Sequence, residues 1–263
     1  MKQTLTEAHY AAIIESSIDA IASKTLDGIV TSWNPSAEMM FGYTAQEMIG
    51  KPMALLIPLG REEEEPQILA KIRNGWSVQH FETIRKKRSG ELFPVSVTIS
   101  PIRDADRSII GASKIVRDIT ERKLSEEEIH KLAFYDALTG LPNRRLLNDR
   151  LEQTKASSKR TSHYAALIFL DLDNFKPLND TFGHDVGDFL LREVAHRISM
   201  CVREVDTVAR FGGDEFVVIL RELDVDKSES TTRAGIVAEK IRTTLAEPYV
   251  LKIQRAGKGE ETV

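Results

Sequence analysis

The chain has 263 residues, of which 41% are hydrophobic and 29% charged, and its formal net charge is -4. This length suits two domains of ordinary size, and the composition is that of a globular protein. The acidic balance argues against a protein that holds nucleic acid polymers or anionic membranes through its overall charge. The single cysteine, Cys201, excludes an internal disulfide, and no apolar run reaches the roughly 18 residues of a membrane span. We therefore expect a soluble, cytoplasmic protein without a membrane span.

The first half of the chain predicts an α+β domain built on one antiparallel sheet. A helix is expected over residues 5–18. Apolar and alternating runs predict five strands, over residues 20–23, 29–33, 78–85, 93–100 and 109–116. Short helices are expected between the second and third strands, over residues 35–40, 46–49 and 62–72. Four glutamates, residues 62–65, begin the last of these helices, and we expect them to be solvated and favoured by the helix dipole.

Several short motifs in this half resemble those of PAS sensor domains of the S-box type. They are Asp27-Gly28, Trp33-Asn34, Phe41-Gly42-Tyr43, Glu47 to Lys51 and Asp118 to Arg122. The resemblance covers residues 10–120 and implies an antiparallel five-stranded sheet with short helices, signal input and dimerisation.

The ligand of this sensor domain stays unknown at this point. Haem-binding relatives carry an iron-ligating histidine where this chain has glutamates and apolar residues, so haem is not expected. His80 lies in a strand pattern and is interpreted as a partly exposed structural histidine. Either Trp33 or Trp76 could pack on a flavin, although a tryptophan in a small sheet domain usually belongs to the core.

A charged segment joins the two halves of the chain. Residues 121–132 contain neither glycine nor proline, which predicts a helix. Ser125, Ile129 and Leu132 fit one heptad of a coiled-coil seam, fewer than the three or four that establish a coiled coil. We expect residues 1–9 to start the N-terminal helix, 10–120 to form the sensor domain, 121–133 the signalling linker and 134–263 the second domain.

Acidic residues follow two strand-like segments of the second half. Residues 164–170 form an unbroken apolar run, expected to be a strand buried on both faces, which leads into Asp171 and Asp173. Residues 206–220 predict a hairpin whose Gly-Gly turn precedes Asp214 and Glu215. Carboxylates at the end of a buried strand are costly unless they have a partner. A hard divalent cation bound through oxygen atoms accounts for acids gathered in this way.

A candidate base-binding pair lies between these acids. Residues 175–180 are expected to form a loop, and an apolar stripe at every fourth position predicts a helix over residues 184–202, with Cys201 as a small core residue. Asp188 lies in the first turn of that helix. A carboxylate and an amide match the edge of guanine, so Asp188 and Asn179 are candidates to bind a purine. The alternative is that Asp188 only stabilises the start of the helix.

Four ordered motifs of this half resemble the GGDEF diguanylate cyclases. They are Asp136-x-Leu138-Thr139-Gly140-Leu141-Pro142-Asn143-Arg144, Asp171-Leu172-Asp173-x-Phe175-Lys176-x-x-Asn179-Asp180, Gly183-His184-x-x-Gly187-Asp188 and Gly212-Gly213-Asp214-Glu215-Phe216. The resemblance implies an α/β palm-like fold akin to nucleotide cyclases. It also implies the condensation of two GTP into cyclic di-GMP with release of two pyrophosphates, in a homodimer whose domains each hold one GTP.

The resemblance also implies roles for individual residues. The metal site would use Asp171, the carbonyl of Leu172, Asp214 and Glu215, with two Mg²⁺ per active site and Mn²⁺ as an alternative metal. The substrate site would use Lys176 at the phosphates, Asn179 and Asp188 at guanine, and Phe175, Gly212 and Gly213 beside the nucleotide. Asp173 is expected to be structural. Arg203 and Asp206 match the R-x-x-D site at which cyclic di-GMP acts as feedback inhibitor.

The second half departs from the family at its end. The family continues with a strand and a helix that carries two phosphate-binding cations, and neither follows residues 248–251 here. We therefore expect a domain that lacks its last strand and helix. Two alternatives to an active cyclase stay open: a catalytically weak receptor for GTP or cyclic di-GMP, and a sensor with an inert second domain.

Overall fold

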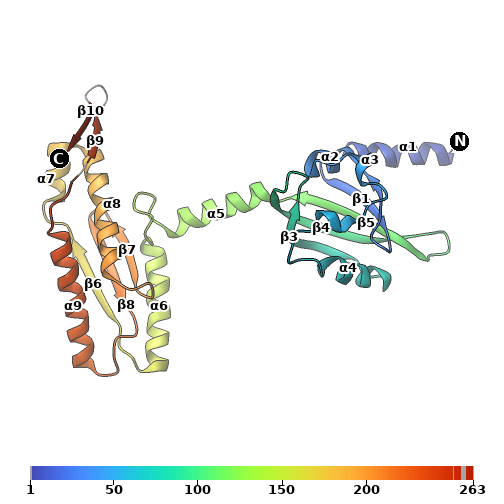
Figure 1. The fold of residues 1–263 in the computed structure, drawn as a ribbon. Helices are drawn as coiled ribbons and strands as arrows, with labels where there is room; N and C mark the ends of the chain where they lie inside the picture. The colour runs from blue at the N-terminus through green and yellow to red at the C-terminus, as the bar shows by residue number, and fades with distance from the viewer. Residues whose placement is uncertain (1, 251, 256–258, 263) are drawn as a thin grey trace. The chain divides into compact units, whose positions relative to one another are not determined.

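The computed structural model describes residues 2–250, 252–255 and 259–262, and the chain forms two compact units, Met1–Ser125 and Glu126–Val263 (Figure 1). Within the described residues, no helix is both long enough and apolar enough to cross a membrane.

The first unit is built on a five-stranded antiparallel sheet in the order β2-β1-β5-β4-β3. Its strands are β1 (Ala20–Thr25), β2 (Val30–Trp33), β3 (Val78–Lys86), β4 (Leu92–Arg103) and β5 (Ile109–Asp118). All five predicted strands are therefore confirmed. They were recognisable because alternate residues face the core, as in β4, where Phe93, Val95, Val97 and Ile99 are buried.

Short helices complete the first unit. They are α1 (Lys2–Glu15), α2 (Pro35–Phe41), α3 (Ala45–Met48), the 3-10 helix η1 (Met53–Leu56) and α4 (Glu64–Arg73). Helix α2 begins as its sequence predicts, because the Asn34 side chain accepts a hydrogen bond from the backbone of Ala37 and Pro35 is the first helical residue. The core combines the inward residues of the sheet with apolar residues of α2, α3, η1 and α4.

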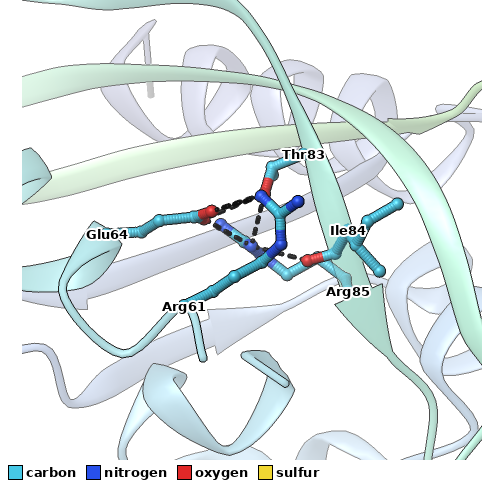
Figure 2. A network of polar contacts seen from close by, with 5 residues as sticks. All are labelled: Arg61, Glu64, Thr83, Ile84 and Arg85. Atoms are coloured by element: carbon cyan, nitrogen blue, oxygen red, sulfur yellow. Dashed lines mark hydrogen bonds and ion pairs between the residues drawn. The ribbon is translucent and has the colours of Figure 1, made fainter. Parts of the chain in front are cut away.

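Two expectations for the first unit are wrong, those for Trp76 and for the glutamate run. Trp76 is 70% exposed, whereas Trp33 lies in the core and donates from its indole nitrogen to the carbonyl of Tyr43. His80 is exposed at an irregularity of β3 with a positive φ of 49°. The glutamate run is not uniformly solvated, because Glu65 binds the buried Lys24 and Glu64 binds the buried Arg85, the latter pair shown in Figure 2. In sequence the four glutamates are alike, and only the packing of α4 on the sheet separates them.

The second unit has a three-stranded antiparallel sheet with helices on both faces. The sheet order is β6-β8-β7, formed by β6 (Ala166–Asp171), β7 (Thr207–Gly212) and β8 (Glu215–Leu220). The helices of this half are α5 (Thr120–Phe134), α6 (Arg144–Thr161), α7 (Phe175–Phe182), α8 (His184–Cys201) and α9 (Lys227–Leu245). Helices α8 and α9 cover one face, and α6 covers β7 and β8 on the other (Figure 1).

Strand β6 differs from its prediction. Leu167 is 39% and Phe169 68% exposed, because α6 lies over β7 and β8 and leaves this face of β6 open. Strand β6 hydrogen-bonds only to β8, so it is an edge strand of this sheet. Strands β9 (Lys252–Arg255) and β10 (Gly259–Thr262) pair with each other and do not join it.

The segment after β6 is a helix, α7, where we expected a loop. Pro177 lies in its first turn, where the missing N–H of proline leaves no hydrogen bond unmade. Asn174 precedes the helix with a positive φ of 60°. Helix α8 follows as predicted, and its buried residues include Val186, Val194, Ile198 and Cys201.

Candidate functional site

The acids of the second unit gather where β6 ends and β8 begins. Asp171 is the last residue of β6 and lies directly opposite Glu215, the first residue of β8. Because cross-strand partners project to the same face, these two carboxylates share one side of the sheet. Asp214 precedes Glu215 in the turn of the β7–β8 hairpin. The antiparallel register thus brings together acids that are 43 positions apart in sequence, between Asp171 and Asp214.

The hairpin turn consists of Gly213 and Asp214. Gly213 has a φ of 54°, a conformation that favours glycine, whereas Gly212 ends β7 with ordinary strand geometry. A Cβ built at either glycine would meet no atom within 4 Å. The space over both residues is therefore open, as the approach of a ligand to this backbone requires.

Arg210 fixes this turn from β7. Its Nε and Nη2 donate to the carbonyl of Gly213 at 2.9 and 2.7 Å, and its Nη1 donates to the Asp136 carboxylate at 3.0 and 3.1 Å. Asp136 also accepts from the backbone and hydroxyl of Thr139 at 2.8 and 2.6 Å. Burial acts to raise the pKa of Asp136, but the hydrogen bonds from Thr139 and Arg210 outweigh it and hold that pKa below its usual value.

Sequence reasoning missed the Arg210–Asp136 pair. Asp136 belonged to a recognised motif but was given no role, and Arg210 was passed over. The signal available in the sequence was an arginine two positions before the Gly-Gly pair. The structure shows that it pairs with Asp136, the first residue of its motif. Together these residues tie the segment that follows α5 to the turn that carries Asp214.

The gathered acids have no internal partners. Within the part of the chain that the structure describes, the side chains of Asp171, Asp214 and Glu215 form no hydrogen bond or ion pair, and the first and last of these are exposed. No group of three or more His, Cys, Asp or Glu side chains among the described residues is close enough to hold a metal as it stands. The carboxylate oxygens of Asp171, Asp214 and Glu215 nevertheless match the ligand preference of a hard cation such as Mg²⁺, so these residues fit a magnesium site.

The candidate guanine pair lies across the contact between α7 and α8. The Asn179 Oδ1 is buried and has no hydrogen-bond partner among the described residues. It points at Gly187, since a Cβ built on that glycine would lie 1.9 Å from it. Asp188 follows Gly187 directly. The missing side chain at residue 187 thus allows the amide to approach the helix start beside the candidate carboxylate.

The remaining candidates are placed less distinctly. Lys176 and Asn179 are three residues apart on α7 and share one side of it. Phe175 is the first residue of α7. Both Phe175 and the partly buried Leu172 pack against the core. Asp173 and Lys176 are exposed, and neither forms a side-chain bond to another described residue.

Asp206 has a structural role in this fold. Its two carboxylate oxygens accept from the backbone N–H groups of Arg203 and Arg221, each at 3.0 Å. It therefore holds the turn before β7 against the end of β8. The exposed side chain of Arg203 lies at the same turn, beside a recess lined by Val202, Arg221, Arg233 and Val237.

Two family profiles match the chain. A profile described as "PAS domain" matches residues 18–121, and one described as "Diguanylate cyclase, GGDEF domain" matches residues 133–256. The chain is a PAS domain followed by a GGDEF domain. Its sensor sheet and its acid-bearing hairpin thus belong to the two families that their motifs resemble.

Curated relatives match between about half and nearly all of the chain. The probable diguanylate cyclase DgcE of Escherichia coli is 33% identical over 76% of this chain and 18% of its own length. The signaling protein YkoW of Bacillus subtilis is 31% identical over 94% of this chain and 29% of its own. The bifunctional diguanylate cyclase/cyclic di-GMP phosphodiesterase MucR of Pseudomonas aeruginosa is 45% identical over 48% and 17%. The chain therefore spans less than a third of each of these relatives.

Proposed function

We propose that this chain is a diguanylate cyclase, which condenses two GTP into cyclic di-GMP and releases two pyrophosphates under the control of its PAS domain. The observation that carries the proposal is the register of β6 on β8, which sets Asp171 opposite Glu215 and beside the turn that holds Asp214. With GTP as substrate, the cytoplasm is the natural compartment for the reaction.

The acids are proposed to hold two Mg²⁺, or Mn²⁺ in their place, through Asp171, Asp214, Glu215 and the carbonyl of Leu172. Bound metal would lower the barrier for attack of a 3′-hydroxyl on an α-phosphate and neutralise the departing pyrophosphate. The carboxylates form no ion pairs with other described residues, so little internal bonding has to be broken when a cation binds.

The substrate is proposed to lie between the hairpin and the helices α7 and α8. Asp188 would accept hydrogen bonds from N1 and N2 of guanine, and Asn179 would donate and accept through its amide. The buried, unpartnered Oδ1 of Asn179 supports this role. Lys176 would bind the phosphates, with Phe175 and the open backbone of Gly212 and Gly213 beside the nucleotide.

The decisive experiment is direct. The purified chain is incubated with GTP and Mg²⁺, and cyclic di-GMP is sought by mass spectrometry as a function of protein concentration. Production that rises more steeply than linearly supports a homodimer in which each domain brings one GTP. Absence of product, together with GTP binding in calorimetry, would leave the receptor alternative.

One feature of the fold favours that alternative, a receptor that binds GTP or cyclic di-GMP with weak turnover. The outer edge of β6 has no partner strand within the described residues, and Phe169 beside it is 68% exposed. A loosely held β6 would place Asp171 imprecisely, and catalysis is more sensitive than binding to such displacement. Nucleotide binding without product therefore distinguishes the receptor from the cyclase, and no binding at all would indicate an inert domain.

Regulation is proposed to pass through α5, residues 120–134. Its first turn binds the PAS domain through Lys123 and Glu82 at 2.8 Å. Its end binds the GGDEF domain, where Asn143 donates to the carbonyl of Ala133 at 3.0 Å and to that of Phe134 at 2.9 Å. Insertion of one to three residues after Arg122 should change cyclase activity, and unchanged activity would contradict this route.

Feedback by cyclic di-GMP is proposed at Arg203 and Asp206. Because the Asp206 carboxylate is already held by two backbone N–H groups, Arg203 is the residue whose removal tests the site without disturbing the turn. Arg203→Ala should relieve product inhibition, and an unaltered inhibition curve would refute the assignment.

A further inference from the structure

The PAS domain buries four charged side chains, and a fifth, the half-buried Glu64, pairs with one of them. They are Lys24 on β1, Glu64 and Glu65 on α4, Arg85 on β3 and Lys114 on β5. The three cations are each at most 1% exposed. Charges removed from water in this way need partners of opposite sign.

Two ion pairs use part of this set. Lys24 pairs with Glu65, and both are buried. Arg85 donates from Nη1 to Glu64 at 2.8 Å, and also to the carbonyl of Ile84 at 2.8 Å. Figure 2 shows this second group, in which Glu64 also accepts from Thr83 and from Arg61.

The cations are left in excess. Three buried cations face the carboxylates of Glu65 and Glu64, and Glu64 also pairs with the exposed Arg61, so at least one positive charge has no counterpart of its own. The Lys114 Nζ and the Nε and Nη2 of Arg85 are buried and have no hydrogen-bond partner among the described residues. One acceptor, Oε2 of Glu65, is also unpartnered. The inward residues of the neighbouring strand β4 are apolar and offer these groups nothing.

The free edge of Arg85 has the shape that a carboxylate fits. Nε and Nη2 form one edge of the planar guanidinium of Arg85, and this edge presents two parallel N–H donors that match the two oxygens of a carboxylate. The ammonium of Lys114 adds further donors. A single negative charge would cancel the excess.

We propose that the PAS domain binds a small hydroxycarboxylate of net charge minus one in its interior. The carboxylate takes the free edge of Arg85 and the ammonium of Lys114, and the hydroxyl donates to Oε2 of Glu65. This site lies in the first domain and does not depend on the activity proposed for the second.

Protonation of Lys114 gives the site a specific signature. Burial, helped by the neighbouring charges of Arg85 and Lys24, lowers the pKa of Lys114 to about 7 against the opposing effect of Glu65 and Glu64. At pH 8 the amine of the ligand-free domain is therefore largely neutral. A bound carboxylate favours the charged form, so binding takes up a proton.

The test is isothermal titration calorimetry of the full chain at pH 8 with sodium glycolate, lactate, glycerate and 3-hydroxybutyrate. Each titration is run in two buffers of different ionisation enthalpy. Propionate, phosphate and chloride at matched ionic strength serve as comparisons. We expect saturable binding of at least one hydroxycarboxylate, weaker binding of propionate and none of phosphate or chloride. The binding enthalpies in the two buffers should differ, and the difference should correspond to the uptake of up to one proton from the buffer.

Two variants locate the binding. Lys114→Met should weaken it about tenfold or more, the loss expected for one charge-assisted hydrogen bond, and abolish proton uptake. It should also raise the thermal midpoint of the ligand-free PAS domain, because an unpaired buried amine is removed. Arg85→Lys keeps the charge but loses the two-donor edge, and should weaken binding to a similar extent. Lys71→Met, on the exposed side of α4, should bind as the parent does.

Several outcomes would overturn the proposal. One is the absence of saturable heat with all four hydroxycarboxylates, which would mean that water alone serves these charges. Another is parental affinity in Lys114→Met or, should that variant not fold, in Arg85→Lys. Preferential binding of phosphate would exclude the carboxylate class.

Discussion

The two domains leave opposite charges without internal partners, and they do so in opposite surroundings. In the PAS domain the free groups are donors of Arg85 and Lys114, which are fully buried. In the GGDEF domain they are the carboxylates of Asp171, Asp214 and Glu215, gathered at the end of two strands and open to solvent to different extents.

The surroundings decide what each set can do. A hydrated carboxylate costs little while it has no partner, so the acids can exchange cations with the solution. A buried cation is not hydrated by the solvent, so leaving it without a partner is costly. It must lose its proton, hydrogen-bond to a water molecule or bind an anion. We infer that the open acids of the GGDEF domain suit a ligand that turns over, and that the buried cations of the PAS domain suit a ligand that is sensed and held.

The sharpest test of this comparison removes a buried carboxylate. Glu65→Gln leaves Lys24 without its partner and raises the buried excess to two positive charges. We expect the free energy of unfolding of the PAS domain to fall by about 3–5 kcal/mol in urea denaturation. Glu63→Gln, two residues earlier and exposed, should change it by less than about 0.5 kcal/mol. Equal effects of the two would mean that burial does not distinguish these glutamates.

The corresponding change at the open acids should act on catalysis and spare stability. Asp171→Asn is expected to lower the rate of cyclic di-GMP formation about 10²- to 10³-fold, since a metal ligand and its charge are lost. The thermal midpoint should stay near that of the parent, because no described residue bonds to this carboxylate. Asp173→Asn is the matched control and should keep most of the activity. A large loss of stability in Asp171→Asn would show that the acid has an internal role.

The pair behind the hairpin should show an intermediate effect. Arg210→Ala removes four hydrogen bonds, two to the Asp136 carboxylate and two to the carbonyl of Gly213, and should lower the free energy of unfolding of the GGDEF domain by about 1.5–3 kcal/mol. Because Arg210 positions the turn and does not touch substrate in our proposal, kcat should fall more than KM rises. Arg160→Ala, on the exposed surface of α6, is the control. A change in KM alone would instead place Arg210 at the substrate.

The smallest effect is expected at an exposed pair. Hydrogen bonds from Lys123 and Arg122 lower the pKa of Glu82 to about 2 from its ordinary 4.5. A lowered pKa means that the stabilisation is complete above pH 4.5 and is lost as the pH falls toward 2. The thermal midpoint of Glu82→Gln should therefore lie slightly below that of the parent at pH 6. The gap should narrow as the pH falls below 4.5 and close near pH 2, and a constant gap would assign the difference to something other than this charge.

Much of the fold could be predicted from local patterns. Alternation revealed the five strands of the PAS sheet, because each strand buries one face, and Asn34-Pro35 marked the start of α2 by capping chemistry. The acids of the second domain could be predicted as a group because each lies at or beside the end of a strand. Helix α7 was missed because Pro177 suggested a loop, although a proline in a first turn is compatible with a helix.

The sequence by itself thus determined the elements, the two families and the identity of the acids, because these depend on neighbours along the chain. Only the tertiary structure decided which charges are buried. Glu63 and Glu65 are the same residue two positions apart, and the packing of α4 on the sheet alone turns one to solvent and the other to Lys24. The same holds for Phe169, whose apolar run resembles a core strand but lies beyond the reach of α6. Burial is set by what other segments cover, and that information is absent from any local stretch of sequence.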